Sequence, residues 1–191
     1  MIKTLCFPLI VFVLMFCVLS NAAQPITNHL FKNHQNKGFQ LYDLKGHFLL
    51  VSFVYTRCPI STMCPLTISL NKRVLTLSRK SLPKLPLRFL IVTLDPAHDT
   101  PEKLREYAKT HGATDPSFVF ATGNEKTIDA FSSEFNAIGF PAGGFISHNS
   151  RTVLLAPDLT FITDYKDNEW KPEDVLKDLK RFSTQKERNR S

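Results

Sequence analysis

The sequence predicts an α/β domain in which a central mixed β-sheet is flanked by helices. Two apolar runs rich in β-branched and aromatic residues, residues 48–55 and 87–94, have the composition of buried core strands. A helical pattern with a proline in its first turn follows each run. Strands that alternate with helices in this way are typical of a sheet covered on both faces.

The first helix is predicted to begin at Pro65, because a proline at the first helical position loses no hydrogen bond. Apolar residues then recur at helical spacing, which predicts that they form the buried face: Leu66, Leu70, Val74 and Leu77. The proline-containing segment 81–86 is predicted to end this helix before the second core strand.

Two further helices and a short strand are predicted in the middle of the chain. The run at residues 99–102, with Pro101 in the first turn, opens a second helix, and Gly112 lies just past its end. Residues 118–121 are predicted to form a short strand. Residues 125–135 predict a third helix whose inward side chains are Ile128, Phe131 and Phe135.

The carboxyl-terminal part predicts a hairpin and a last helix. Residues 152–155 and 160–165 are strand-like and flank a turn at Pro157. Pro172 then begins an amphipathic helix that carries Val175, Leu179 and Phe182. The thioredoxin fold is the compact arrangement that fits this order. It places reactive cysteines between the first core strand and its helix.

The first 23 residues have the layout of a secretory signal peptide, with Lys3, an apolar run over residues 5–19, and small residues at its end. An uncleaved membrane anchor is the alternative, although a run of about 15 residues is short for a span of about 20. Residues 24–37 are polar and predict a spacer. Residues 38–183 are predicted to form the folded domain, and residues 184–191 a basic tail.

The net charge is +7, from 24 basic and 17 acidic residues in a chain of 191. The basic residues gather in residues 72–88 and 177–190, which predicts a solvated helix face and a tail. Attraction to an acidic partner or an anionic membrane surface is the alternative. No aromatic stripe is interleaved with these charges and no nucleic-acid motif is present, so we expect no nucleic-acid partner.

Two cysteines of the predicted domain follow the first core strand directly. Cys58 and Cys64 lie around the start of the next helix, whereas Cys6 and Cys17 belong to the leader. A helix amino terminus stabilises a thiolate, which is both the nucleophile of thiol chemistry and the metal-binding form of cysteine. The pair therefore predicts a redox or metal site, in preference to a structural disulfide.

The spacing of these cysteines favours a metal. Five residues separate them, so their sulfurs can spread around an ion. Thiolates select Cu(I), zinc or iron–sulfur chemistry. A structural zinc site uses four protein ligands, whereas Cu(I) accepts two or three soft ones. The small number of candidate ligands therefore favours copper.

A third ligand would come from one of 6 histidines. His148 immediately precedes the predicted hairpin, and in a thioredoxin fold the residue that leads into this hairpin faces the active cysteines. The others have different expected places: the surface for His29, His34 and His111, a turn for His47, and the end of the second core strand, within approach of the site, for His98.

Two stretches of the chain resemble the Sco/SenC family. The first is VSFVYTRCP at residues 51–59, with Cys64-Pro65 after it, and the second is VTLDPAHDTPE at residues 92–102. The segment FVFATG at residues 118–123, His148, and LAPD at residues 155–158 agree in order and spacing. The resemblance runs from about residue 38 to about residue 179, most of the chain after the leader.

This resemblance implies a thioredoxin-like fold and an exported protein of the periplasm or an intermembrane-type compartment, often tethered to the inner membrane. It implies a copper site with Cys58 and Cys64 as thiolate ligands and His148 as the imidazole ligand. The ion would be Cu(I), with Cu(II) as the alternative state. The implied partner is a target cuproprotein or a subunit of cytochrome c oxidase, whose copper centre the family helps to assemble. Asp95 would support the site or cap the turn after its strand.

Three features depart from the family pattern. The family usually has three residues between the cysteines, where this chain has five. Ser147 stands where an acidic residue commonly precedes the histidine. The segment before the first core strand is short, which suggests a reduced amino-terminal hairpin. Met63, a soft side chain next to Cys64, could touch copper, contact a partner or pack against the protein.

The wider spacing leaves thiol–disulfide exchange open as a second function. One cysteine would attack a partner disulfide and the other would resolve the mixed disulfide, so that Cys58 and Cys64 are catalytic and His148 is dispensable. A peroxidase site of the peroxiredoxin kind is a third interpretation, with Thr56 and Arg57 as peroxide-binding residues beside Cys58. It is disfavoured, because adjacent residues of one strand do not converge on a single point.

Overall fold

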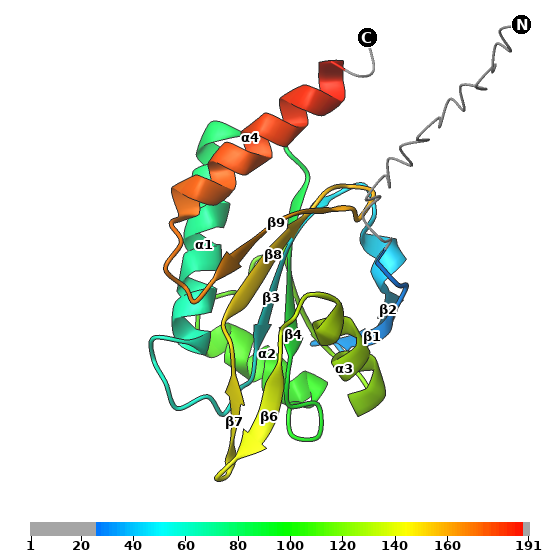
Figure 1. Ribbon diagram of the computed structural model, residues 1–191, viewed down its shortest axis with the longest axis vertical. Helices are drawn as coiled ribbons and strands as arrows, with labels where there is room; N and C mark the ends of the chain where they lie inside the picture. The colour runs from blue at the N-terminus through cyan, green and yellow to red at the C-terminus, as the bar shows by residue number, and fades with distance from the viewer. Residues whose placement is uncertain (1–25, 189–191) are drawn as a thin grey trace, which may run out of the picture.

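A 7-stranded mixed sheet forms the centre of the structure, a computed structural model that describes residues 26–188 (Figure 1). The strands lie in the order β2-β1-β5-β4-β3-β8-β9. β3 (Phe48–Val54), β4 (Leu87–Thr93) and β5 (Phe118–Thr122) are parallel neighbours at its centre. β8 (Arg151–Leu155) pairs with β3 in the antiparallel direction. The sheet confirms the predicted fold class.

Helices cover both faces of this sheet (Figure 1). α1 (Cys64–Ser81), α2 (Pro101–Thr110) and α4 (Pro172–Arg188) contribute to the apolar core on one face. α3 (Glu125–Glu134) and the 3-10 helix η1 (Leu41–Leu44) contribute to the core on the other face. All three parallel strands lie between the two cores, which explains why their sequences are continuous apolar runs.

The side chains of β3 alternate between these two cores. Leu50 and Val54 pack on the side of α1, whereas Leu49 and Val51 pack on the side of α3. Every residue of β3 is buried. The strand therefore ends in the interior of the domain, and the loop that follows it begins from a fixed point.

The start of α2 agrees with the prediction, whereas the cap at the start of α3 was not predicted. The Thr100 side chain accepts a hydrogen bond from the backbone of Lys103 at the start of α2, with Pro101 in the first turn. The Asn124 side chain accepts one from the backbone of Thr127 at the start of α3. Each bond satisfies a backbone N–H that has no partner inside its helix.

The buried face of α1 differs from the predicted one. Val74 is buried as predicted, but Leu66, Leu70 and Leu77 are only partly covered. Asn71 lies inward instead, and its Nδ2 donates to Ser52 Oγ at 2.9 Å, which is itself 3.0 Å from Thr152 Oγ1. A buried polar network thus joins the helix to the sheet. In this orientation the first residue of α1, Cys64, is also buried.

The segment expected as a spacer contains a strand. β1 (Leu30–Asn33) pairs with β2 (Gly38–Gln40) in a short hairpin and also with β5, so it forms part of the main sheet. His29, expected at the surface, is buried, with Nε2 2.7 Å from Glu134 Oε1. Such a strand is too short and too polar to show a clear alternating pattern, which is why the sequence predicted a spacer here.

A second, separate sheet of two strands was not predicted. β6 (Gly139–Ala142) and β7 (Phe145–His148) form a ribbon that projects beyond the end of β3 and β4 (Figure 1). The hairpin predicted next in the chain is present as β8 and β9 (Phe161–Lys166). His148 is therefore the last residue of a strand, and the ribbon determines its position.

The two ends of the chain are described in part. The expected leader, residues 1–23, lies outside the described residues, as do residues 189–191. α4 reaches Arg188, so the helix continues into the segment expected as a basic tail. No helix among residues 26–188 is both long and apolar enough to cross a membrane.

Candidate metal centre

Three elements that are far apart in the sequence bring Cys58, Cys64 and His148 together. Cys58 lies in the loop after β3 and is partly exposed, whereas Cys64 is the first residue of α1 and is only 1% exposed. His148 ends β7 and is half-buried. Both cysteines are free thiols. The predicted site residues thus meet at the strand-to-helix junction of the fold.

The geometry of these side chains suits a single small ion. Their ligand atoms, the two sulfurs and one imidazole nitrogen, all lie within 4.8 Å of one another. Cys64 Sγ is 3.4 Å from His148 Nε2. Within residues 26–188, no other group of three histidine, cysteine or acidic side chains has this arrangement.

The His148 ring is oriented for coordination through Nε2. Its Nδ1 lies 3.0 Å from the Asn149 carbonyl oxygen, which can only accept a hydrogen bond, so Nδ1 carries the proton. The ring forms a T-shaped contact with Tyr55, with the ring centroids 5.5 Å apart. The Asn149 backbone carbonyl therefore accepts the hydrogen bond that a carboxylate often accepts from a metal-binding histidine. The acidic residue that Ser147 replaces is not needed for this bond.

The two thiols differ strongly in acidity. Hydrogen bonding from the Cys64 side chain, with smaller contributions from backbone N–H groups, lowers the pKa of Cys58 to about 5. The same interaction with Cys58 and the burial of Cys64 raise the pKa of Cys64 far above its usual range. At neutral pH the reduced pair therefore holds one thiolate, on Cys58, and one proton, on Cys64.

This difference predicts how many protons a thiolate-binding metal displaces. Near pH 8, loading one Cu(I) should release about one proton, from Cys64, because both ligands must be thiolates and Cys58 already is one. The apparent affinity should then fall about tenfold per pH unit as the pH is lowered from 8 toward 7. A pH-stat titration measures the release. Two protons near pH 8 would contradict the assignment of the thiolate to Cys58.

Buried carboxylates hold the loop that carries Cys58. Asp99 is completely buried and accepts hydrogen bonds from the Thr56 backbone N–H at 3.0 Å and the Thr56 hydroxyl at 2.5 Å. The Thr93 hydroxyl donates to it as well. Arg57 Nη2 donates to Asp95 Oδ2 at 2.6 Å. The residues immediately before Cys58 are thus fixed to the loop after β4.

These contacts decide between two roles expected from the sequence. Asp95 supports the site through Arg57, the neighbour of Cys58. Asp99 was assigned only to the start of a helix, and its contact with Thr56 was missed. The clue in the sequence is a Thr and an Arg directly before Cys58, with two aspartates after the next strand. Since Thr56 and Arg57 bind these carboxylates, their side chains are not arranged as a peroxide site beside Cys58.

The remaining histidines do not join the site. His98, which was expected to approach it, contacts Lys103 Nζ at 3.1 Å. His34 Nδ1 lies 3.3 Å from the backbone nitrogen of Phe120, and the ring of His111 packs on Tyr107. The structure therefore selects His148 from the candidates by position.

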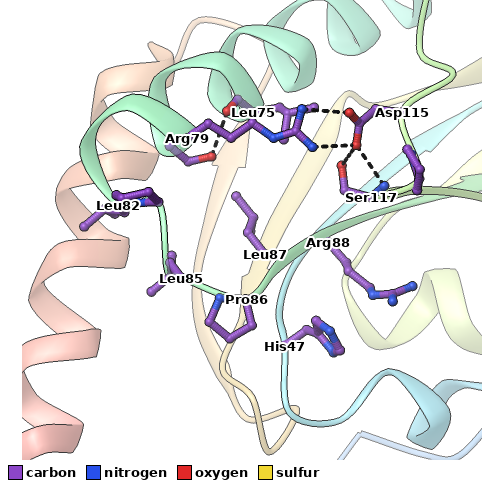
Figure 2. Close-up of a pocket in the computed structure, with 13 residues that line it drawn as sticks. His47, Leu75, Arg79, Leu82, Leu85, Pro86, Leu87, Arg88, Asp115 and Ser117 are labelled. Carbon is purple, nitrogen blue, oxygen red and sulfur yellow. Dashed lines mark hydrogen bonds and ion pairs between the residues drawn. The ribbon is translucent and has the colours of Figure 1, made fainter.

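His47 lines a different cavity, at the opposite end of β3 (Figure 2). This cavity of about 360 Å³ is bordered by apolar residues of the turn after α1 and by the ion pair between Arg79 and Asp115, 2.7 Å apart. His47 precedes β3, whereas Cys58 follows it. The length of the strand therefore separates His47 from the two thiols.

The fold and the site together define a thioredoxin-like protein with a thiol pair and a histidine at the junction between β3 and α1. The chain is similar to known proteins of this class. The sequence profile of the SCO1/SenC family matches residues 20–184. The chain belongs to the SCO1/SenC family, as the resemblance of its motifs implied.

Individual relatives agree with this membership. The SCO1 protein homolog of Bacillus subtilis (strain 168) is 29% identical over 174 residues, which cover 88% of this chain and 86% of that protein. The structure of BsSco, a Sco-family cytochrome c oxidase assembly protein with a disulfide switch, matches with a TM-score of 0.72 and 26% identity, over 84% of this chain and 94% of that one. Copper-bound ScoI of Arabidopsis thaliana shares the fold, with a TM-score of 0.72 and 17% identity over 81% and 98% of the two chains.

Proposed function

We propose that the protein binds one copper ion through Cys58, Cys64 and His148 and delivers it to a target cuproprotein during assembly of cytochrome c oxidase. The observation that carries this proposal is the grouping of three suitable ligand atoms within 4.8 Å. Membership of the SCO1/SenC family supports the same reading. The bound state is Cu(I), with Cu(II) as a second state of the same site.

The ligand set fits copper better than zinc. Two thiolates and one imidazole are soft or borderline donors, which Cu(I) prefers. A structural zinc ion would need a fourth protein ligand, and no fourth histidine, cysteine or acidic residue of the described chain joins this group. Membership in the family and the donor set therefore point to the same metal.

The exposure of the ligands suggests the order of transfer. Cys58 is partly exposed, whereas Cys64 is buried, so an incoming ligand of the target reaches the Cys58 side of the ion first. Cys64 and His148 would keep hold of copper until a second ligand of the target arrives. The predicted leader and the protein's Sco/SenC relatives support a location of this exchange outside the cytoplasm, in the periplasm or an intermembrane-type compartment. The leader would serve as a signal peptide or as an inner-membrane anchor.

His148→Ala tests this proposal. The variant should weaken Cu(I) binding about 10- to 100-fold, because two thiolates still hold the ion but the third donor is lost. Competition with a Cu(I) chelator under anaerobic conditions measures the change. His98→Ala is the matched control, since His98 lies outside the cluster and should leave the affinity unchanged. Equal affinity of the His148→Ala and wild-type proteins would contradict the three-ligand site.

Thiol–disulfide exchange is a second candidate function, favoured by the unequal acidity of the two cysteines. The partly exposed Cys58 thiolate would attack a partner disulfide, forming a mixed disulfide and releasing one partner thiolate. Cys64, once deprotonated, would attack Cys58 in that mixed disulfide and release the second partner thiol. The chain ends with a Cys58–Cys64 disulfide and the partner is reduced.

The same histidine variant separates the two functions. Exchange needs only the two sulfurs, so His148→Ala should retain the ability to reduce a model disulfide while it loses copper affinity. A variant that loses both activities would assign His148 to both.

A further inference from the structure

Met63 occupies a fixed place in the loop between the two cysteines. Its carbonyl oxygen accepts hydrogen bonds from the Thr67 backbone at 2.9 Å and from Asn168 Nδ2 at 3.1 Å. Its own N–H donates to the Ile60 carbonyl at 3.0 Å. The backbone of Met63 is therefore fixed directly before Cys64, whereas its side chain can rotate.

The Met63 side chain lies outside the two apolar cores. It is half-buried, yet it belongs to neither apolar core cluster. It lines a cavity of about 390 Å³ together with His148, Asn149 and Leu66. A flexible thioether thus shares a cavity with His148, one of the three proposed copper ligands, and directly precedes a second, Cys64, in the chain.

The chemistry of this side chain suits one oxidation state of copper. A thioether is a soft, uncharged donor that favours Cu(I), whereas Cu(II) prefers nitrogen and oxygen donors in a tetragonal arrangement. An unbranched side chain with several rotatable bonds can also adjust its position around an ion. The five-residue spacing of the cysteines is what provides this additional sulfur.

We propose that Met63 Sδ is a further ligand that binds Cu(I), but not Cu(II), at the site formed by Cys58, Cys64 and His148. This inference rests on the proposed copper-binding function. Met63 would then set the preference of the site for the reduced ion, which the two cysteines and the histidine alone would hold less selectively.

The Met63→Leu variant tests this preference, because leucine keeps the apolar volume and removes the sulfur. Cu(I) affinity should fall about tenfold, the lower end of the range for loss of a supporting contact, while Cu(II) affinity stays unchanged. Thr62→Ala is the control, since Thr62 lines the same cavity and has no sulfur. Equal losses for Cu(I) and Cu(II), or no loss for either, would overturn the proposal.

A spectroscopic measurement tests the contact directly and does not depend on affinity. The full chain labelled with selenomethionine is loaded with one Cu(I), and copper-edge X-ray absorption is recorded for the wild type and for Met63→Leu. Met63 is the only methionine in residues 26–188. A copper–selenium distance in the wild type that disappears in the variant is the expected result.

Two other outcomes are distinct from each other. Tight binding of one copper without a selenium neighbour would overturn the role of Met63 and leave the proposed function intact. Absence of stable copper binding by the wild-type protein would overturn the proposed function itself.

Discussion

Replacing Cys64 with serine is expected to weaken Cu(I) binding by more than about 100-fold, since loss of a mere supporting contact already costs a metal site up to about 100-fold. Cys64 is buried, and its Sγ lies 3.4 Å from His148 Nε2. It is therefore a central member of the cluster that it forms with His148 and Cys58. A serine hydroxyl is a hard donor that remains protonated at neutral pH and cannot replace a thiolate.

The measurement is an anaerobic competition titration with a Cu(I) chelator of known affinity. Ser61→Ala is the matched control, because Ser61 lies exposed in the same loop and is not a member of the cluster. Wild-type affinity in Cys64→Ser would show that copper does not bind across the two cysteines. Circular dichroism of each variant checks that the fold is intact.

Replacing Asp99 with alanine is expected to lower the free energy of unfolding by about 3 kcal/mol. Its carboxylate is fully buried and accepts hydrogen bonds from the Thr56 backbone, the Thr56 hydroxyl and the Thr93 hydroxyl. Alanine leaves these donors without their acceptor, among them the fully buried Thr93 hydroxyl. Because Thr56 lies two residues before Cys58, the loop that presents this thiol should also become more mobile.

Urea unfolding followed by circular dichroism measures the stability of this variant. Asp129→Ala is the control, since that side chain is exposed on α3 and its loss should change the stability by less than about 0.5 kcal/mol. Asp99→Asn should fall between the wild type and Asp99→Ala, because an amide oxygen can accept some of the same bonds. Wild-type stability in Asp99→Ala would mean that the folded protein does not depend on these bonds.

Elements with strong local patterns were predictable from the sequence. β3 and β4 are continuous apolar runs, α2 has Pro101 in its first turn, and α3 has apolar residues at helical spacing, so composition and spacing alone identified them. The position of Cys58 and Cys64 between the end of β3 and the start of α1 followed from the same reasoning. The chemistry of the thiol pair was therefore foreseeable before any tertiary contact was known.

Features that depend on tertiary contacts were not predictable in this way. The buried face of α1 includes Asn71, because its side chain donates a hydrogen bond to Ser52 on β3. Ser52 in turn lies within hydrogen-bond distance of Thr152 on β8. β1 joins the sheet by pairing with the edge of β5 that β4 leaves unpaired. These partners are distant in the sequence, so no local pattern reveals the pairing.

The candidate site shows the same division. His148 could be chosen only with the help of the family resemblance, because the ribbon of β6 and β7 that brings it to Cys64 is short and has no clear pattern of its own. The carboxylate of Asp99 acts across the fold on Thr56. Sequence spacing indicated a helix start at that position and could not indicate this contact.

The most direct test of the copper site is a thiol-protection titration of the reduced full-length protein. Cu(I) is added stepwise without oxygen, the bound copper is measured, and alkylation of each cysteine is followed by mass spectrometry of the peptides. Saturation is expected at one copper per chain, with Cys58 and Cys64 becoming protected together at that same point. Copper that binds while Cys64 remains as accessible to denaturant-assisted alkylation as in the metal-free protein would contradict it.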